Sequence, residues 1–375
     1  MKVYLKVLLT ILFFNQNIFS QEKNEIANDP ISINYDIIKI YDYNKIIWAF
    51  EFIDENTIIF TDKKGKIFIL KNNKIQEISG VPEIYFMGQG GLMDIELHPK
   101  FDQNNKVFLS FAESSNKNDG GNTAIMSAIL DQNKLINKEI LYRGKENSTK
   151  GQHWGSRIQF DKEGFLFFTI GDRGSRNVNP QDLSRDGGKV YRINEDGSIP
   201  QDNPFVDKND IIDAIYSYGH RNPQGIFLHP ETGMIWTNEH GPKGGDEINI
   251  IRKGKNYGWP TITYGKNYNG TIITNLKKLF GMEQPLYYWT PSIAPSSFEY
   301  ITSDKYDNWK GNLLAGSLSF GYLERLVLDD QNKVIFREKI AKDIGRVRDV
   351  VESPDGYIYL SVENKGIFKL IPIEN

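Results

Sequence analysis

The amino-acid sequence predicts an all-β protein, a six-bladed β-propeller with four-stranded antiparallel blades and long inter-strand loops. This prediction depends on a repeated turn-and-strand sequence pattern, on the composition, and on the lack of a comparably long amphipathic helical pattern. The chain has 33 glycines among 375 residues, and 13% of its residues are aromatic. Such a composition is typical of short strands joined by tight turns.

The repeated pattern is a polar or proline-containing turn followed by a short strand in which apolar and polar residues alternate. Turns of this kind beside alternating apolar residues are hairpin signals. Copies at irregular spacings of roughly 45 to 75 residues predict separate sheets around one ring. A β-sandwich or two smaller β-domains are the alternatives that the repeat leaves open. The six strands that follow these turns are 58–62, 106–111, 165–172, 234–241, 312–319 and 357–364.

The ring needs a closing strand, and the sequence offers one near its beginning. Residues 30–45 alternate in a strand-like pattern, and we expect them to pair with the C-terminal blade. Closure would remove the exposed edges that an open sheet leaves.

The longest gaps between copies of the repeat run from Gly171 to Pro223 and from Gly241 to Pro295. Because loops on a rigid scaffold usually carry the functional site, we expect the site there.

The first twenty residues have the features of a signal peptide. Residues 1–6 carry two lysines, residues 7–14 are almost wholly apolar, and Ser20 offers a small residue at a cleavage point. This pattern predicts an exported protein, periplasmic or secreted. Residues 21–375 are then expected to form a single propeller domain. No later apolar run is long enough to cross a membrane, so no membrane span is expected in the mature chain.

Composition also excludes several classes of function. The chain has no cysteine, which excludes disulfides and thiolate sites. Its 45 basic and 48 acidic residues are interspersed and give a net charge of -3, so no nucleic-acid partner is expected. The motifs of nicotinamide, ATP and serine-hydrolase sites are missing.

Two short segments place polar side chains at strand ends. His153 comes just before a predicted strand and Asp172 stands at its far end. A histidine there could act as a general base, although a lone histidine is more often a structural residue. Arg221 and Asn222 directly precede Pro223, and the guanidinium could donate to a carboxylate or a quinone oxygen.

The segment 238–260 could supply oxygen ligands to a metal. Two glycine-containing pairs expose carbonyl groups, and Asp246 and Glu247 follow directly. Calcium binds carboxylate and carbonyl oxygens, but the spacing does not match an EF-hand.

A pair of arginines occupies the start of a late strand. Arg346 and Arg348 alternate, so both side chains should face the same side. Two like charges on one face favour an anionic partner such as a cofactor with several carboxylates. Without a ligand they would be solvated or paired with Asp349 and Glu352.

These segments together resemble the soluble PQQ-dependent aldose sugar dehydrogenases, six-bladed propellers of the glucose/sorbosone dehydrogenase type. The matching stretches follow the family's order across residues 88–370. They include GQGGLMDIELHPKF, HWGSRIQFDKEGFLFFTIGDRG, GGKVYRINEDGSIPQDNPF, SYGHRNPQG, NEHGPKGGDEINIIRKGKNYGWPTITYG and RVRDVVESPDGYIYL.

The resemblance implies oxidation of an aldose at its anomeric carbon to the lactone, with PQQ and Ca²⁺ as cofactors and an unidentified electron acceptor. His153 matches the general base that takes the anomeric hydroxyl proton. Asp172 matches the acid that orients this base, and Gln89 matches a residue that contacts base and substrate. Arg221 matches the residue that stabilises charge on the cofactor oxygen.

Further matches concern the cofactor. Asn222, Tyr268, Arg346 and Arg348 match residues that contact the quinone, as Arg221 also does. Ser319 stands where the family commonly has a lysine that contacts it, so one cation is expected to be missing.

The remaining matches concern calcium. The carbonyls of Gly241 and Pro242 match those that hold the cofactor's calcium. Glu247 and the carbonyl of Tyr257 match a second, structural calcium site, with Asp246 as an additional ligand.

Two other functions remain as alternatives. One is a non-catalytic propeller that binds glycan or protein and has a degenerate quinone site, which the departure at Ser319 favours. The other is a calcium-dependent lactonase-like hydrolase, which the arginine-rich rim disfavours.

Overall fold

The structure is a computed structural model that describes residues 33–373, so the expected signal peptide lies outside the described residues. The described chain contains 24 strands. Its helical elements are the short α1 (Phe101–Asn104) and a single 3-10 turn, η1 (Lys117–Asp119). Within these residues there is no helix with the length and apolar character that a bilayer crossing requires.

The strands form six antiparallel sheets of four strands each, which confirms the predicted propeller. The first blade contains β2 (Ile47–Asp54), β3 (Thr57–Asp62), β4 (Lys66–Lys71) and β5 (Lys74–Ile78). The second contains β6 (Leu92–Leu97), β7 (Lys106–Glu113), β8 (Asn122–Asp131) and β9 (Lys134–Arg143). The third contains β10 (Ile158–Phe160), β11 (Leu166–Ile170), β12 (Lys189–Ile193) and β13 (Ile215–Tyr218).

The second half of the chain continues this order. The fourth blade contains β14 (Pro223–Leu228), β15 (Ile235–Glu239), β16 (Asp246–Ile250) and β17 (Tyr287–Trp289). The fifth contains β18 (Pro295–Tyr300), β19 (Leu313–Ser317), β20 (Leu323–Leu328) and β21 (Val334–Ile340). The sixth contains β22 (Val347–Glu352), β23 (Ile358–Val362), β24 (Gly366–Pro372) and β1 (Tyr35–Tyr41).

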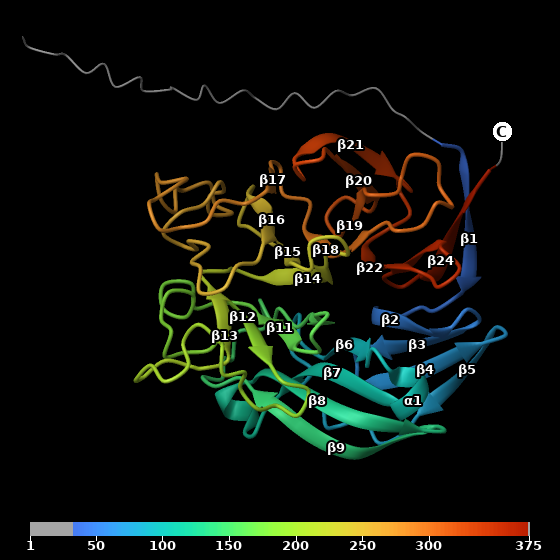
Figure 1. Cartoon of the computed structure of the whole chain (residues 1–375), viewed down its shortest axis with the longest axis horizontal. Helices are drawn as coiled ribbons and strands as arrows, with labels where there is room; N and C mark the ends of the chain where they lie inside the picture. Colours follow the sequence, from blue (N-terminus) through green and yellow to red (C-terminus); the bar gives the residue numbers. More distant parts are fainter. Residues whose placement is uncertain (1–32, 374–375) are drawn as a thin grey trace, which may run out of the picture.

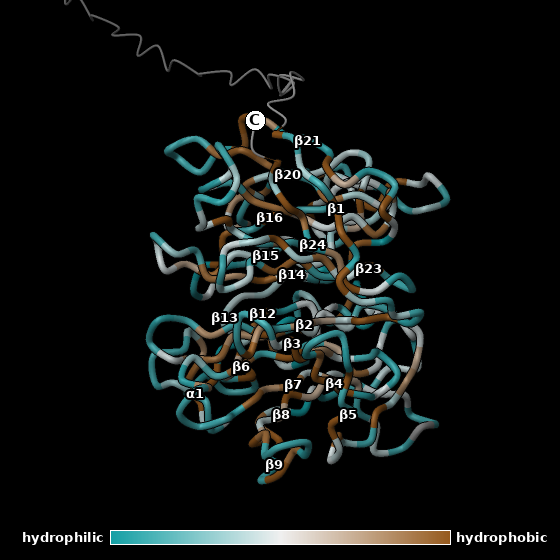
Figure 2. Tube along the Cα trace, turned by 90° about the vertical axis from the view of Figure 1, so that its right-hand side faces the viewer, coloured by the Kyte–Doolittle hydropathy of each residue, from teal (hydrophilic) through white to brown (hydrophobic). Residues whose placement is uncertain are grey.

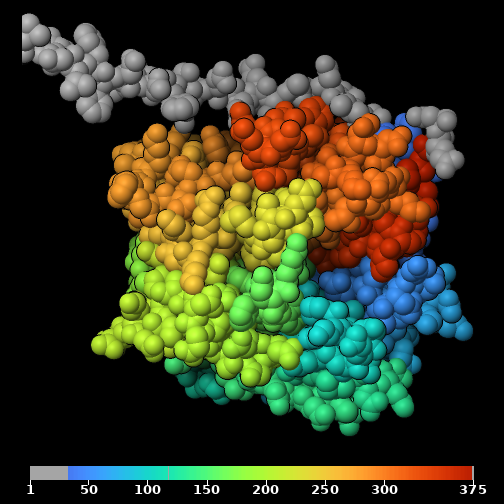
Figure 3. All heavy atoms as spheres, viewed as in Figure 1, coloured from blue at the N-terminus to red at the C-terminus, as the bar shows by residue number. Residues whose placement is uncertain are grey.

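The N-terminal strand closes the ring, as the sequence predicted. β1 pairs with β24 in an antiparallel register that runs from Tyr35 opposite Pro372 to Tyr41 opposite Ile367 (Figure 1). The first strands of neighbouring blades contact one another around a closed circle. In Figure 3 the blue N-terminal and the red C-terminal parts of the described chain therefore lie side by side.

The copies of the repeated turn-and-strand pattern correspond to the second strand of every blade. These strands lie between two others of their sheet and are covered on both faces by neighbouring blades, which explains their apolar character. In β11 all five residues are buried. Figure 2 shows brown, hydrophobic stretches along the strands and mostly teal loops around them. The long gaps carry the outer strands β12, β13, β16 and β17 together with extended loops.

Candidate active site

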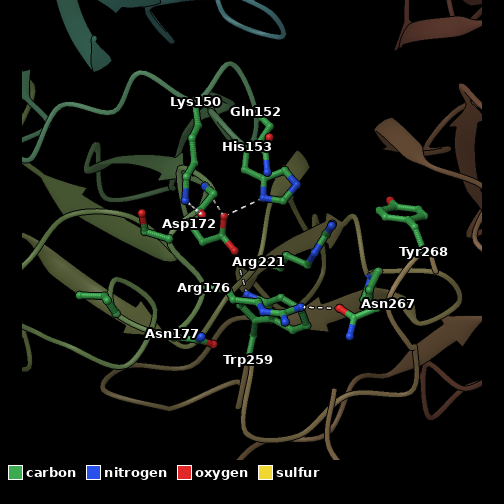
Figure 4. Close-up of a pocket in the computed structure, with 14 residues that line it drawn as sticks. Lys150, Gln152, His153, Asp172, Arg176, Asn177, Arg221, Trp259, Asn267 and Tyr268 are labelled. Atoms are coloured by element: carbon green, nitrogen blue, oxygen red, sulfur yellow. Dashed lines mark hydrogen bonds and ion pairs between the residues drawn. The ribbon is translucent and has the colours of Figure 1, made fainter. Parts of the chain in front are cut away.

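His153 and Asp172 form the centre of the candidate site. Nδ1 of His153 lies 2.6 Å from Oδ1 of Asp172 (Figure 4). The histidine side chain is 12% exposed and that of the aspartate 1%. A proton on Nδ1 that is shared with the carboxylate leaves Nε2 of the neutral ring as an acceptor. This is the arrangement of a base that a third group orients.

Asp172 is itself fixed by other donors. Its Oδ1 also accepts the N–H of Gly174 at 2.7 Å, and its Oδ2 accepts the indole N–H of Trp259 at 2.9 Å. Its own N–H donates to the carbonyl of Arg221 at 2.8 Å. The carboxylate therefore has its oxygens directed before any substrate arrives.

The electrostatic environment keeps the pair in the required ionisation states. Burial lowers the pKa of His153, and the charges of Arg221 and Arg173 lower it further, against the raising effect of Asp172. For Asp172 burial raises the pKa, but the hydrogen bond and charge of His153, with Arg221 and Trp259, outweigh it and leave the pKa below its ordinary value. At neutral pH the histidine is therefore neutral and the aspartate ionised, so His153 can accept a proton.

The backbone at His153 adopts an unusual conformation. Its φ is 57°, in the left-handed region that a histidine rarely adopts. Its N–H donates to Oε1 of Gln89 at 2.8 Å, and the N–H of Gln89 donates to the carbonyl of Gly151 at 2.6 Å. A Cβ at Gly88 would lie 2.3 Å from that carbonyl oxygen, so the close approach of the two segments requires glycine there. Gln89 therefore contacts the backbone of the candidate base.

Arg173 holds the same segment from the other side. Its guanidinium lies 3.3 Å from the ring centroid of Trp154. It donates to the carbonyl of Gln152, and at 3.2 Å to those of Gly121 and Lys150. Sequence reasoning missed Arg173 as a positioning residue, although it directly follows Asp172 in the chain.

Arg221 and Asn222 lie beside the histidine. Nη1 of Arg221 donates to the carbonyl of His240 at 2.8 Å, and its backbone N–H donates to Glu239 at 2.6 Å. The Nε of Arg221 is buried and has no hydrogen-bond partner among the described residues. Oδ1 of Asn222 accepts the N–H of Gly155 at 3.1 Å. Arg221 is therefore a firmly held cation with a free donor.

A pocket of about 500 Å³ opens in front of these groups. The two long loops, in which the sequence predicted the functional site, line much of it. Figure 4 shows the ring of Tyr268 on the far side of the pocket from Asp172. Tyr268 is 74% exposed. The predicted site residues that line the pocket are His153, Asp172, Arg221, Pro242 and Tyr268.

Arg346 and Arg348 do share one face, but their partner differs from the expected acids. Both pair with Glu363, which accepts Nε of Arg346 at 2.6 Å and Nε of Arg348 at 2.9 Å. Pairing with Asp349 and Glu352 was one of the two alternatives for the pair without a ligand, and it does not occur; the side chain of Arg346 is 52% exposed. Asp349 instead forms an ion pair with Arg157 at 2.9 Å. Glu363 follows β23, which pairs with β22, so the sheet register brings it to the arginines.

Lys63 adds a cation near this pair. Its Nζ donates to the carbonyl of Gly88 at 2.6 Å. Burial lowers the pKa of Lys63 to about 8, and the charges of Arg348 and Arg346 contribute to the decrease. Ser319 is exposed, and its N–H donates to the carbonyl of Ile293 at 3.1 Å.

The predicted calcium loop has a tight local structure. A Cβ at Gly241 would lie 1.8 Å from the carbonyl oxygen of Gly245, so this turn requires glycine. Asp246 accepts the N–H of Gly241 and the N–H of Ala294, each at 2.7 Å. The observed role of Asp246 is thus to shape the turn. The carbonyl of Pro242 accepts the hydroxyl of Ser292 at 2.9 Å.

Behind this loop two carboxylates lie together. Burial and the charge of Glu239 raise the pKa of Glu247 well above its ordinary value. The amide of Asn249 bridges the two, donating to Glu239 at 2.9 Å and to Glu247 at 3.2 Å. These acids and Tyr257 line one small cavity. Across residues 33–373 there is no cluster of three or more histidine, cysteine, aspartate or glutamate residues placed to hold a metal.

Comparison with known proteins identifies the family. Residues 44–370 match the family described as Glucose / Sorbosone dehydrogenase. The chain belongs to this family. Aldose sugar dehydrogenase YliI of Escherichia coli is 36% identical over 352 residues, which cover 92% of this chain and 94% of that protein. Quinoprotein glucose dehydrogenase B of Acinetobacter calcoaceticus is 28% identical, covering 83% of this chain and 82% of that protein.

Two solved structures of aldose sugar dehydrogenases have the same fold. The apo-form crystal structure of the soluble aldose sugar dehydrogenase from Escherichia coli has a TM-score of 0.85 and 34% sequence identity. That match covers 91% of this chain and 100% of the solved one. The PQQ-bound aldose sugar dehydrogenase of Streptomyces coelicolor has a TM-score of 0.73 at 23% identity, covering 91% of this chain and 99% of that one, and it shares the fold.

Proposed function

We propose that this chain oxidises aldoses at the anomeric carbon to the lactone, with PQQ and calcium as cofactors. The observation that carries the proposal is the pair of His153 and Asp172 at 2.6 Å beside the buried cation Arg221. Family membership supports the reaction class, since relatives bear the names aldose sugar dehydrogenase and quinoprotein glucose dehydrogenase.

Each of these residues has a defined task in the reaction. Nε2 of His153 accepts the proton of the anomeric hydroxyl, and Asp172 stabilises the imidazolium that forms. Gln89 holds the backbone of the base through the 2.8 Å bond to its N–H. Arg221 stabilises negative charge that develops opposite the base, because its guanidinium is held in place beforehand.

The residues present fit PQQ, which carries three carboxylates. Arg346 and Arg348 face one side with Glu363 between them, and Arg221 has a buried Nε without a partner. When bound, the quinone would supply the hydride acceptor and calcium would supply Lewis-acid polarisation. Asn222 and Tyr268 complete the set of quinone contacts that we assign.

Lys63 supplies the positive charge that Ser319 does not. It is half-buried beside Gly88, in the turn that carries Gln89, and it is close enough to Arg346 and Arg348 for their charges to lower its pKa. A cation held against like charges is favoured by an anionic ligand, because the ligand removes the repulsion.

The residues also fit calcium at two places. The carbonyls of Gly241 and Pro242 would hold the cofactor's calcium. Glu247 and the carbonyl of Tyr257 would hold a structural calcium, joined by Glu239, which sequence reasoning missed. The like charges of Glu239 and Glu247 in one buried place favour a divalent cation there.

Reconstitution tests the proposal. Purified protein is mixed with PQQ and CaCl₂, quinone binding is followed by absorbance, and dye reduction is followed with glucose. We expect stoichiometric binding and sugar-dependent dye reduction. A protein that binds no quinone by absorbance and by calorimetry would contradict the proposed function.

We further propose that residues 1–20 are a signal peptide and that the protein is exported. The cofactor would then be acquired outside the cytoplasm.

A further inference from the structure

The pocket in front of His153 has an excess of positive charge. Its charged lining side chains are three cations, Lys150, Arg176 and Arg221, and one acid, Asp172. The carboxylate of Asp172 is already bound to His153 at 2.6 Å. Of the described residues, none forms an ion pair within 4.0 Å with any of the three cations. The net charge of the lining is therefore positive, and within residues 33–373 no acid forms an ion pair with these cations.

Arg176 is held in place by a neutral partner. Its Nη1 donates to Oδ1 of Asn267 at 2.7 Å (Figure 4). The amide of Asn267 in turn donates to the hydroxyl of Thr271 at 2.9 Å. The guanidinium is thus oriented across the pocket between two long loops, and its charge stays available. A guanidinium fork matches a planar carboxylate or a phosphate.

Lys150 is arranged in the same way. Its Nζ donates to the carbonyl of Gly174, which is also neutral. Of the cations that we assign to the cofactor, Arg346, Arg348 and Lys63 do not line this pocket, whereas Arg221 does. The charges of Lys150 and Arg176 are therefore left for the part of the pocket that takes the sugar.

We propose that the preferred substrates are aldoses with an anionic group, a carboxylate or a phosphate, at the end remote from the anomeric carbon. The proposal rests on the proposed function, since the anomeric hydroxyl must point to Nε2 of His153. The anionic group then pairs with Arg176, with Lys150 adding to the local positive potential.

The test compares glucuronate, glucose 6-phosphate and glucose as substrates of the reconstituted protein. We expect kcat/KM for at least one anionic sugar to exceed that for glucose, and the two anionic sugars distinguish carboxylate from phosphate. Arg176→Gln should lower the anionic-to-neutral ratio by about tenfold or more, since it removes a charge-assisted pair. Arg176→Lys should retain most of the ratio because it retains the charge.

Two controls separate the possible causes. Lys266→Gln removes one positive charge next to Asn267 without changing a lining side chain, and we expect the ratio to stay the same. PQQ affinity, measured by titration, should not change in Arg176→Gln. A lower PQQ affinity together with an unchanged ratio would overturn the proposal, because Arg176 would then serve the cofactor.

The failures of the two proposals differ in what is observed. If glucose is oxidised and the anionic sugars have no advantage, the substrate inference is wrong and the proposed function stands. If no aldose is oxidised, the proposed function is wrong. In that case, calorimetric titration of the PQQ-loaded protein with glucuronate and with glucose still measures the preference for an anionic sugar. Equal affinities for the two sugars would overturn the substrate inference.

Discussion

Asp172→Asn isolates what the carboxylate does for His153. The change keeps the size of the side chain and removes its charge. In the structure the carboxylate accepts three donors, from His153, Gly174 and Trp259. An asparagine has one acceptor oxygen, so its amide must face the indole N–H of Trp259 or displace the histidine from its orientation. The base therefore loses its charged partner in either orientation.

The expected loss follows from the contact that is removed. A hydrogen bond to a charged group contributes about 1.5–3 kcal/mol, which corresponds to a roughly 10- to 150-fold lower kcat. The pKa of His153 should fall further, because the hydrogen bond and charge of Asp172 are what raise it. Since the base works in its neutral form, the decline of activity at acid pH should move to lower pH.

The assay is dye reduction at saturating sugar across a range of pH, with PQQ affinity measured in parallel. Asp182→Asn is a matched control, since Asp182 is an acid of the same long loop that accepts the hydroxyl of Ser184 at 2.6 Å. We expect this control to keep its kcat. A kcat in Asp172→Asn within about threefold of wild type, at unchanged PQQ affinity, would refute the role of Asp172 as the orienting acid.

Two further changes test other parts of the site and the scaffold. Lys63→Met should weaken PQQ binding about tenfold in a titration, because one cation of the cofactor pocket is lost. The neighbouring Lys64→Met should leave the PQQ affinity unchanged, and equal affinities for both variants would contradict the role of Lys63. Burial raises the pKa of Glu299 to about 8 from its ordinary 4.5, with help from Glu352 and Asp349. The folded protein then holds a proton that the unfolded chain releases between these values, so stability should fall as the pH rises through this range. Glu299→Gln should therefore raise the free energy of unfolding at alkaline pH by about 1 kcal/mol or more, and should have little effect near pH 4. Calorimetry measures this free energy, and an increase that does not depend on pH would contradict this reasoning.

Much of the fold could be predicted from the sequence because its signals are local. Each turn and the strand after it lie within a short stretch, and these stretches became the second strand of each blade. The closing strand was also predictable, since its alternating pattern had no other place in a ring of six sheets.

The site could be predicted only in part, because its contacts join residues that are distant in the chain. His153 and Asp172 are 19 residues apart and flank one hairpin, and their pairing was predicted from the resemblance to the family. Trp259 lies 87 residues from Asp172 in a long loop without a regular pattern, and nothing in the sequence indicated that it would meet the carboxylate. Glu363 was missed because only the register of β22 and β23 shows that it faces Arg346 and Arg348.

Reduction of bound PQQ by an aldose in wild-type and His153→Ala protein tests the assignment of the base most directly. Both proteins should bind PQQ with the same affinity, because the loss of the imidazole leaves Arg221, Arg346 and Arg348 in place. Wild-type protein should reduce the quinone when sugar is added, and the variant should do so about 100-fold or more slowly. Equal rates of reduction in the two proteins would contradict the assignment of His153 as the general base.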